Sequence, residues 1–276
     1  MKLRSMILRG GLPALVLGLG LLTAGCGGGK PVLHIYNWTS YLKPELLRDF
    51  EQAHNCRVRM DHYDSNEAMY AKLKAGATGY DVIFPSSYMA RIMNQQDMLQ
   101  PIRHDLIPNL AHLDRDFLEL TEDREMRYSV PYMVTASGIG YRADQLEAPE
   151  PTWGLFADPR FAGRMTLLND MRETIGAALK FLGYSLNTTD ETQLEAALEV
   201  LLTWKANIAK FESEQYKHGL ASAEFFLAHG YNGDVLQVME ESPDVAWFFP
   251  QEGVSLASDD MVIPADARQV ELAHAF

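Results

Sequence analysis

The sequence predicts an α/β protein. Short apolar runs alternate with segments of helical periodicity, which is typical of sheets covered by helices. About 250 residues follow the N-terminal segment, and 47% of the chain is hydrophobic, so the core is large enough for one big domain or two smaller ones. No Pro/Ser-rich linker separates the two blocks of elements. Two lobes would therefore be joined by short hinge strands that allow only opening and closing.

The first block contains alternating strands and helices. Residues 67–75 should form a helix with Asp64 and Glu67 as its capping box. Residues 80–84 barely alternate in polarity, so we expect a strand that is buried on both faces. The other predicted elements are strands at 32–36 and 57–63 and a helix at 43–53.

The second block begins near residue 132 and has the same mixed character. Thr188 and Glu191 can cap a long amphipathic helix at 191–205. Strands are expected at 137–141 and 165–168.

The last seven residues, 270–276, have the apolar periodicity of a helix but no C-terminal cap. Leu272 and Phe276 would have nothing to pack against there. We therefore expect that the sequence is truncated.

The N-terminus has the layout of a secretory signal. Three basic residues without an acid precede the apolar run 12–22, which is shorter than the roughly 20 residues that span a bilayer. Small residues directly before Cys26 resemble a lipobox, so we expect cleavage there and a lipid on this cysteine. Thr23 departs from the usual branched residue, which leaves ordinary cleavage nearby as the alternative. Residues 26–31 would then form a flexible tether.

Charge and cysteine content narrow the class of protein. The chain carries a formal charge of −13, and without the three cations of residues 1–25 it carries −16. This excess argues against a nucleic-acid partner, which requires a basic face. It suits a cationic ligand, although solubility explains an acidic surface about as often. With Cys26 lipidated, Cys56 has no disulfide partner and should be a buried apolar residue.

Catalytic and metal-binding motifs are missing from the sequence. It contains no Gly-x-Ser-x-Gly, His-Glu-x-x-His, Cys-x-x-Cys or Gly-x-Gly-x-x-Gly motif, and its eight histidines are scattered. We therefore expect a binding protein rather than an enzyme, with no cofactor.

Aromatic and acidic residues instead recur after predicted strands, where open α/β sheets bind their ligands. These segments are 36–41, 85–88, 169–173, 230–234 and 258–260.

Together these segments resemble the bacterial spermidine/putrescine-binding proteins of ABC transporters, within the periplasmic binding protein superfamily. The resemblance runs from about residue 33 to the end. It rests on Tyr36-Asn37-Trp38-Thr39-x-Tyr41, Ser65-Asn66-Glu67-x-Met69-Tyr70-Ala71-Lys72-Leu73, Tyr80-Asp81-Val82-x-x-Pro85-Ser86, Asp170-x-Arg172-Glu173 and Leu182-Gly183-Tyr184-Ser185-x-Asn187-Thr188-Thr189-Asp190.

The resemblance implies a two-lobed fold with a ligand cleft between the lobes. Lobe one would comprise residues 32–134 and 258–276, and lobe two residues 135–257. The expected partners are a polyamine, an ABC-transporter permease and the membrane, through the lipid on Cys26. The protein would be a monomer in the periplasm or at the cell surface.

A polyamine site needs carboxylates for the ammonium groups and apolar or aromatic surface for the methylenes. Because a buried ammonium group without partners costs several kcal/mol, at least two acids must face the cleft. The resemblance places Asp259 at the central ammonium group, whereas its neighbour Asp260 is expected to be a solvated strand residue. The candidate ligand-binding residues are Trp38, Thr39, Tyr41, Ser86, Tyr88, Asp170, Glu173, Tyr231, Asp234 and Asp259.

The chain departs from the family pattern within the site. Ser40 replaces an acid, Ala257 replaces a cleft aromatic residue, and Tyr231 replaces a tryptophan. Another small cationic or organic solute, or a surface sensor with the same fold, therefore remains an alternative. Among polyamines, the four candidate acids favour spermidine over putrescine, because a diamine would leave two of them unpaired.

Overall fold

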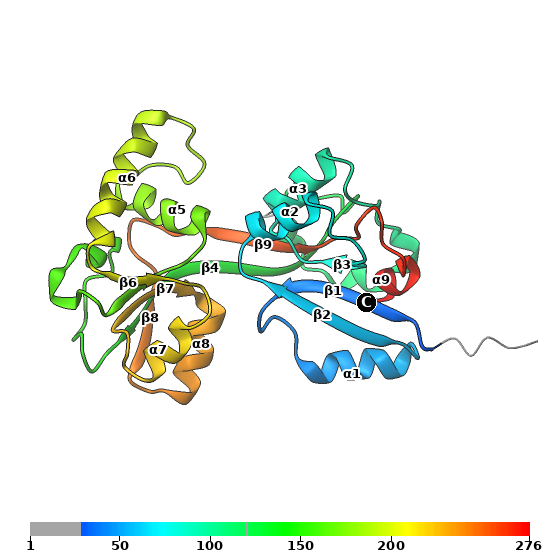
Figure 1. The fold of residues 1–276 in the computed structure, drawn as a ribbon, viewed down its shortest axis with the longest axis horizontal. Helices are drawn as coiled ribbons and strands as arrows, with labels where there is room; N and C mark the ends of the chain where they lie inside the picture. Colours follow the sequence, from blue (N-terminus) through cyan, green and yellow to red (C-terminus); the bar gives the residue numbers. More distant parts are fainter. Residues whose placement is uncertain (1–28, 120) are drawn as a thin grey trace, which may run out of the picture.

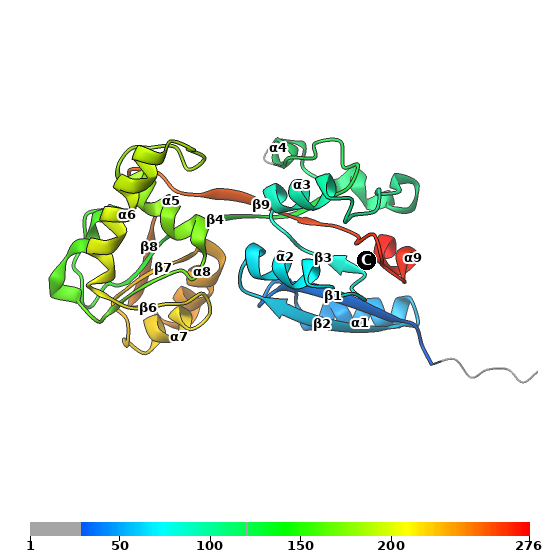
Figure 2. The same cartoon turned by 45° about the horizontal axis from the view of Figure 1, so that its top comes forward.

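The computed structural model describes residues 29–119 and 121–276. The predicted signal, lipobox and Cys26 lie outside these residues. The described elements form two groups, each built on its own sheet, and Figures 1 and 2 show that β4 and β9 run from one group to the other. The strands are β1 (Val32–Trp38), β2 (Arg57–Tyr63), β3 (Val82–Ile83), β4 (Val130–Arg142), β5 (Met165–Leu167), β6 (Ile208–Phe211), β7 (Leu227–Tyr231), β8 (Val245–Phe248) and β9 (Leu256–Met261).

Lobe one is built on a three-stranded parallel sheet in the order β2-β1-β3. The central strand β1 is largely buried, with Leu33 and Ile35 fully inside the core. β3 is only two residues long, shorter than the predicted strand at 80–84, and both of its residues are buried. The helices of this lobe are α1 (Pro44–Ala53), α2 (Asn66–Lys74), α3 (Ser87–Gln95), α4 (Arg115–Leu118) and α9 (Val270–Ala275).

Lobe two is built on a larger mixed sheet in the order β6-β5-β7-β4-β8. Its core contains the buried rings of Trp153, Phe156 and Trp204, which pack against the strands. The helices of this lobe are α5 (Met171–Phe181), α6 (Glu191–Lys205), α7 (Tyr216–Ala221) and α8 (Asn232–Glu241).

The two lobes are joined by adjacent antiparallel strands. Residues 130–136 of β4 pair with β9, while residues 137–142 pair with β7 and β8. β9 also contacts lobe one through the bridges Ile83–Val262 and Ser86–Asp259. The proposed lobe boundaries fall inside β4 and β9, so paired strands connect the lobes.

Two predicted helix caps are wrong by one or two residues. Ser65, not Asp64, caps α2 and accepts a hydrogen bond from the Ala68 N–H. Asp190, not Thr188, caps α6. In both cases the residue directly before the helix is the one whose side chain reaches the free N–H groups.

The prediction that the last helix lacks packing partners is also wrong. Leu272 and Phe276 are half-buried against the lobe-one core, and the Phe276 ring lies edge-on to Phe50 with centroids 5.1 Å apart. The Asp81 carboxylate accepts hydrogen bonds from the backbone N–H groups of Arg268 and Gln269, which fixes the chain before α9. Cys56 is buried, as predicted.

Candidate ligand-binding cleft

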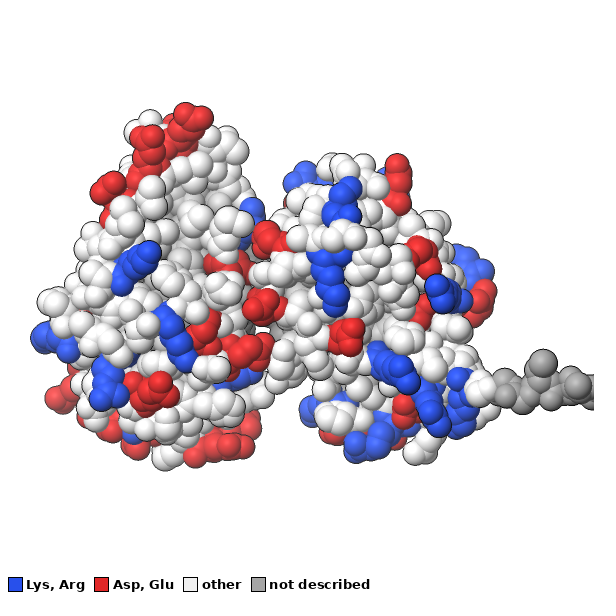
Figure 3. Space-filling view, viewed as in Figure 1, with Lys and Arg blue, Asp and Glu red and all other residues white. Residues whose placement is uncertain are grey.

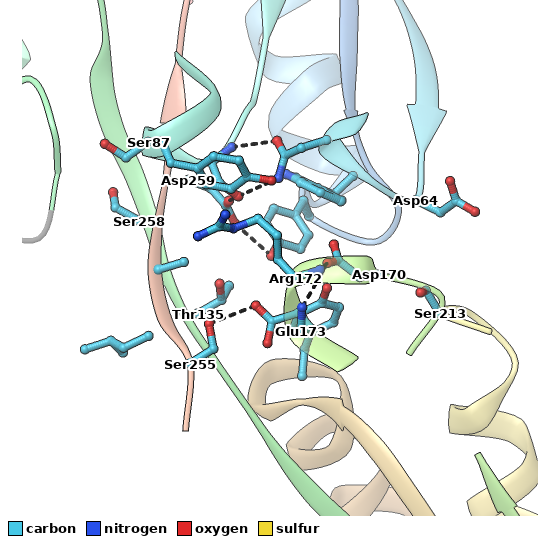
Figure 4. A pocket seen from close by; sticks show the side chains of 18 of the residues that line it. Asp64, Ser87, Thr135, Asp170, Arg172, Glu173, Ser213, Ser255, Ser258 and Asp259 are labelled. Atoms are coloured by element: carbon cyan, nitrogen blue, oxygen red, sulfur yellow. Dashed lines mark hydrogen bonds between the residues drawn. The ribbon is translucent and has the colours of Figure 1, made fainter. Parts of the chain in front are cut away.

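A cavity of about 290 Å³ lies between the two lobes, and all ten candidate residues line it. Lobe one contributes the segment after β1 and the start of α3, and lobe two contributes the starts of α5 and α8. β9 runs past both walls with Asp259 (Figure 4). In the space-filling view of Figure 3, acidic side chains border the groove between the lobes.

Asp259 is the most deeply buried acid of this cavity, with 3% of its surface exposed. The Ser86 hydroxyl donates to one carboxylate oxygen at 2.6 Å, and the Tyr41 hydroxyl donates to the other at 3.1 Å. Burial raises the pKa of Asp259 to about 7, although both hydrogen bonds oppose this shift. No ion pair to Asp259 is found in residues 29–119 and 121–276.

Ser86 is held in place by Asn66, a residue that the sequence did not single out for the site. The Asn66 side chain donates to the Ser86 hydroxyl at 3.0 Å and accepts from the Ser86 N–H at 3.0 Å. The Ser86 hydroxyl proton is therefore directed to Asp259. The sequence contained only a weak signal for this role, because Asn66 lies in a segment that reads as the start of a helix.

Glu173 and Asp170 enter the cavity from the start of α5 and differ in their partners. Asp170 accepts hydrogen bonds from the N–H groups of Arg172 and Glu173, so it caps this helix. Glu173 accepts a hydrogen bond from the Ser255 hydroxyl at 2.9 Å, and its other oxygen is buried without a partner (Figure 4). Burial raises the pKa of both carboxyl groups.

Arg172 provides a contact between the lobes. Its guanidinium group lies over the Tyr88 ring, 4.4 Å from the centroid. The Tyr88 hydroxyl donates to Glu67 at 3.1 Å, and Arg172 donates to the Asn187 side chain at 3.2 Å. This end of the cavity therefore already contains one cation of the protein.

Asp234, at the start of α8, has a cationic partner. The Lys217 ammonium group lies 3.4 Å from one carboxylate oxygen, and the Tyr216 hydroxyl donates to the other at 2.6 Å. The same hydroxyl accepts the Tyr231 N–H at 3.1 Å. A Cβ atom at Gly230 would lie 2.5 Å from the Tyr216 ring, so glycine is required for this close approach.

Aromatic side chains form the wall of the cavity beside β1. Trp38 donates its indole N–H to the Phe84 carbonyl at 2.8 Å and packs on Tyr63, with centroids 4.5 Å apart. The Tyr41 ring lies 6.3 Å from that of Trp38. These contacts fix the rings, while Trp38, Thr39 and Tyr41 still line the cavity.

The prediction for Asp260 is wrong, because this residue is fully buried rather than solvated. Its carboxylate accepts hydrogen bonds from the hydroxyls of Thr121, Ser129 and Ser258 at 2.7–3.0 Å. Ser40 is exposed in a turn after β1 with a φ of 60°, and Ala257 lines the cavity.

Among residues 29–119 and 121–276, no group of three or more His, Cys, Asp or Glu side chains could hold a metal ion. In the same part of the chain, no helix is long and apolar enough to cross a membrane.

Residues 45–276 match the family model for bacterial extracellular solute-binding proteins. The chain is 33% identical to the putrescine/cadaverine-binding protein of Pseudomonas aeruginosa, covering 88% of this chain and 73% of that protein. It is 34% identical to the spermidine/putrescine-binding periplasmic protein of Escherichia coli, covering 94% and 75%.

Solved structures also match this chain. The TpPotD lipoprotein of Treponema pallidum matches with a TM-score of 0.81 and 38% identity, over 89% of this chain and 78% of that one. The spermidine/putrescine ABC transporter substrate-binding protein PotD of Streptococcus pneumoniae matches with a TM-score of 0.72 and 31% identity, over 90% and 76%.

Proposed function

This chain belongs to the bacterial extracellular solute-binding proteins, and on that premise we propose that it binds a polyamine for import by an ABC transporter. The relatives reported above are named for putrescine, cadaverine and spermidine. In this proposal the ligand lies in the cavity between the lobes, and closure of the lobes presents the complex to the permease.

One observation carries the proposal: apart from the helix cap Asp170, two buried carboxylates in an aromatic-lined cavity have no ion-pair partner among the described residues. They are Asp259 and Glu173, and burial raises the pKa of each. A buried carboxylate is unfavourable unless a cation pairs with it. An alkyl diamine would supply two ammonium groups for these acids, and its methylenes would lie against apolar and aromatic surface.

The candidate residues then divide by role. Asp259 and Glu173 would bind ammonium groups, with Ser86 and Tyr41 orienting Asp259. Asp170 would fix the start of α5 while adding negative charge. Four aromatic side chains and one hydroxyl would line the ligand's path, namely Trp38, Tyr41, Tyr88, Tyr231 and Thr39.

Titration calorimetry of the mature protein with putrescine, cadaverine, spermidine and spermine tests this proposal. We expect saturable binding of at least one polyamine and no comparable heat with Mg²⁺, because a compact divalent ion cannot reach two separated acids and also contact the aromatic wall. Equal heats with Mg²⁺ and polyamines would contradict a polyamine site.

We also propose that a lipid on Cys26 anchors a monomer to the membrane, in the periplasm or at the cell surface. This cysteine precedes the described residues, and the support comes from the lipobox-like sequence. Cys26→Ser should release the protein from membranes without a change in ligand affinity, because the anchor and the cleft are separate. Recovery of the variant with salt-washed membranes would exclude the anchor.

A further inference from the structure

We propose that lobe one has a basic surface that contacts anionic phospholipid headgroups of the membrane to which the protein is anchored. This inference rests on the proposed lipid on Cys26, which would bring one end of lobe one to the membrane. Five exposed cations at that end form the basic surface, namely Lys30, Arg57, Arg59, Lys72 and Lys74.

The basic surface lies where the described chain enters lobe one. Arg57 begins β2, and its backbone N–H donates to the Pro31 carbonyl at 2.9 Å, so this arginine lies beside the segment that leads from Cys26. Arg59 is two residues further along the strand, so its side chain leaves the same face of the sheet. In Figure 3, Lys and Arg side chains gather on this part of lobe one, beside the start of the described chain.

The end of α2 adds two lysines on the same side of the sheet. Lys72 donates to the Tyr80 hydroxyl at 2.8 Å, and this hydroxyl donates to the Asp61 carboxylate at 2.7 Å. Asp61 is two residues beyond Arg59 on β2 and shares its face. Lys74 follows in the last turn of the helix. The cations of β2 and α2 therefore belong to one continuous surface.

The five cations of the basic surface have no ion-pair partner within residues 29–119 and 121–276. A cation without an internal partner can attract an external anion without first losing a contact. The whole chain is acidic, so only an orientation that presents the basic surface brings positive charge to an anionic bilayer. The arginines of lobe one that do have carboxylate partners lie elsewhere, namely Arg91, Arg103, Arg124 and Arg127.

The length of the tether limits how far the basic surface can lie from the bilayer. Residues 27–31 separate Cys26 from β1, and a fully extended chain over these steps reaches about 20 Å. Headgroup attraction acts over about one Debye length, about 10 Å at 0.1 M salt. The anchor therefore keeps the cations where they can meet headgroups, and each cation at the surface strengthens the contact about fivefold.

This orientation leaves the ligand cleft accessible. The basic surface begins at the N-terminal ends of β1 and β2, whereas Trp38 and Tyr41 line the cleft at the other end of β1. The seven residues of β1 span about 20 Å. The contact with headgroups would thus hold the cleft clear of the membrane surface.

Chemical footprinting of lysines on vesicles tests the inference. The mature chain is coupled through Cys26 to a maleimide lipid, in vesicles of phosphatidylcholine alone or of equal parts phosphatidylcholine and phosphatidylglycerol. Cys56 is buried, so the coupling is specific. A membrane-impermeant reagent then acetylates exposed lysines. We expect Lys30 and Lys74 to react at least about threefold more slowly, relative to Lys205 on α6, in the anionic vesicles. High salt should restore their rates, because it screens the headgroup charge.

Arg57→Gln/Arg59→Gln removes two cations from the basic surface and leaves the reporter lysines in place. The contact should weaken about tenfold or more, so the protection of Lys74 should disappear. Arg57→Lys/Arg59→Lys keeps both charges and should keep the protection. Melting curves of both variants check their folding, and the lipid and salt comparisons need only the wild-type chain.

Arg115→Gln/Arg124→Gln is the matched control for net charge. Arg115 begins α4, and Arg124 pairs with Glu119 directly after it. Figure 2 shows α4 on the other side of lobe one from β2. This variant should keep the protection of Lys30 and Lys74, because the lost charges lie away from the basic surface.

The outcomes separate this inference from the proposed function. Equal lysine reactivity in the two kinds of vesicle would overturn the basic surface as a membrane contact. Protection that persists in Arg57→Gln/Arg59→Gln would assign the contact to another surface. Because the lipid is supplied chemically, neither result depends on the natural anchor. Wild-type protein recovered from cells without a lipid on Cys26 would instead refute the proposed anchor.

Discussion

Asp259 and Asp260 are consecutive acids on β9, and both are buried, yet their surroundings differ. Asp260 accepts three side-chain hydroxyl hydrogen bonds and does not line the cavity. Asp259 has two hydroxyl partners and lines the cavity. The polar environment of Asp260 is complete, whereas that of Asp259 has room for a cation. Asp260 therefore stabilises the fold, whereas Asp259 is available to a ligand.

The largest effect should come from Asp259→Asn. Loss of a desolvated charge partner commonly costs about 2–5 kcal/mol of binding free energy, so polyamine affinity should fall at least tenfold in calorimetry. Thermal stability without ligand should change little, because the variant loses one of two acceptor oxygens but also removes a charge whose burial is unfavourable. Unchanged affinity would remove Asp259 from the site.

Asp260→Asn is the matched variant, with the same chemical change one residue later. Asparagine loses one acceptor oxygen and places an NH₂ group among three hydroxyl donors, which should lower the free energy of unfolding by about 1–3 kcal/mol. Polyamine affinity of the folded variant should stay near wild type. Denaturant titration measures the free energy of unfolding, and calorimetry on the same sample measures polyamine affinity. A large loss of affinity would show that Asp260, like Asp259, contributes to ligand binding.

Ligand binding through Asp259 should depend on pH, because burial raises the pKa of this carboxyl group to about 7. A bound ammonium group favours the ionised carboxyl, so below about pH 7 binding must displace a proton. Putrescine affinity should therefore fall as the pH drops from 8 to 5.5, approaching tenfold per unit for one proton. Asp259→Asn should flatten this profile, and an equally steep profile in the variant would assign the proton to another group.

The contribution of Asp259 to the stability of the ligand-free protein should change with pH in the opposite direction. The pKa of Asp259 is higher in the folded protein than in the unfolded chain, so the protonated carboxyl contributes stability at low pH that is lost as the pH rises through about 7. The rise in melting temperature caused by putrescine should therefore be larger at pH 8 than at pH 5.5. A constant rise across this range would contradict a role for the carboxyl in binding.

The smallest effect is expected for Tyr88→Phe at the Arg172 end of the cleft. The aromatic ring that contacts the Arg172 guanidinium group remains, and only the hydrogen bond to Glu67 is lost. Polyamine affinity should change by less than about 1 kcal/mol. A loss as large as that of Asp259→Asn would mean that the tyrosine hydroxyl contacts the ligand directly.

Hydrophobic periodicity predicted most elements of the fold, because it depends on local sequence. The strand at 57–63 and the helix at 191–205 match β2 and α6. β3 was predicted too long, since burial alone does not show where ladder pairing ends. The caps Ser65 and Asp190 were missed because adjacent polar residues differ only in backbone geometry.

The candidate site was predicted largely through resemblance, and the ten residues line one cavity. The sequence could not reveal the Lys217–Asp234 pair, because the two residues lie on different helices that only the fold brings together. The prediction that Asp260 is solvated was wrong, because alternation along a strand implies a solvated face only where one side of the strand is open to water. β9 runs between the lobes and is covered on both sides there, so neighbouring acids are both buried.

The path of β9 has a consequence for the order of folding. Lobe two is formed by one continuous stretch of chain, whereas lobe one needs residues from both sides of it. The Asp81 and Ser86 side chains find partners 187 and 173 residues later, at Arg268 and Asp259. Closing such long loops carries a larger entropic cost and is slow. We therefore expect lobe two to complete its core first and to bring the ends of lobe one together, which would make the ligand cleft one of the last features to form.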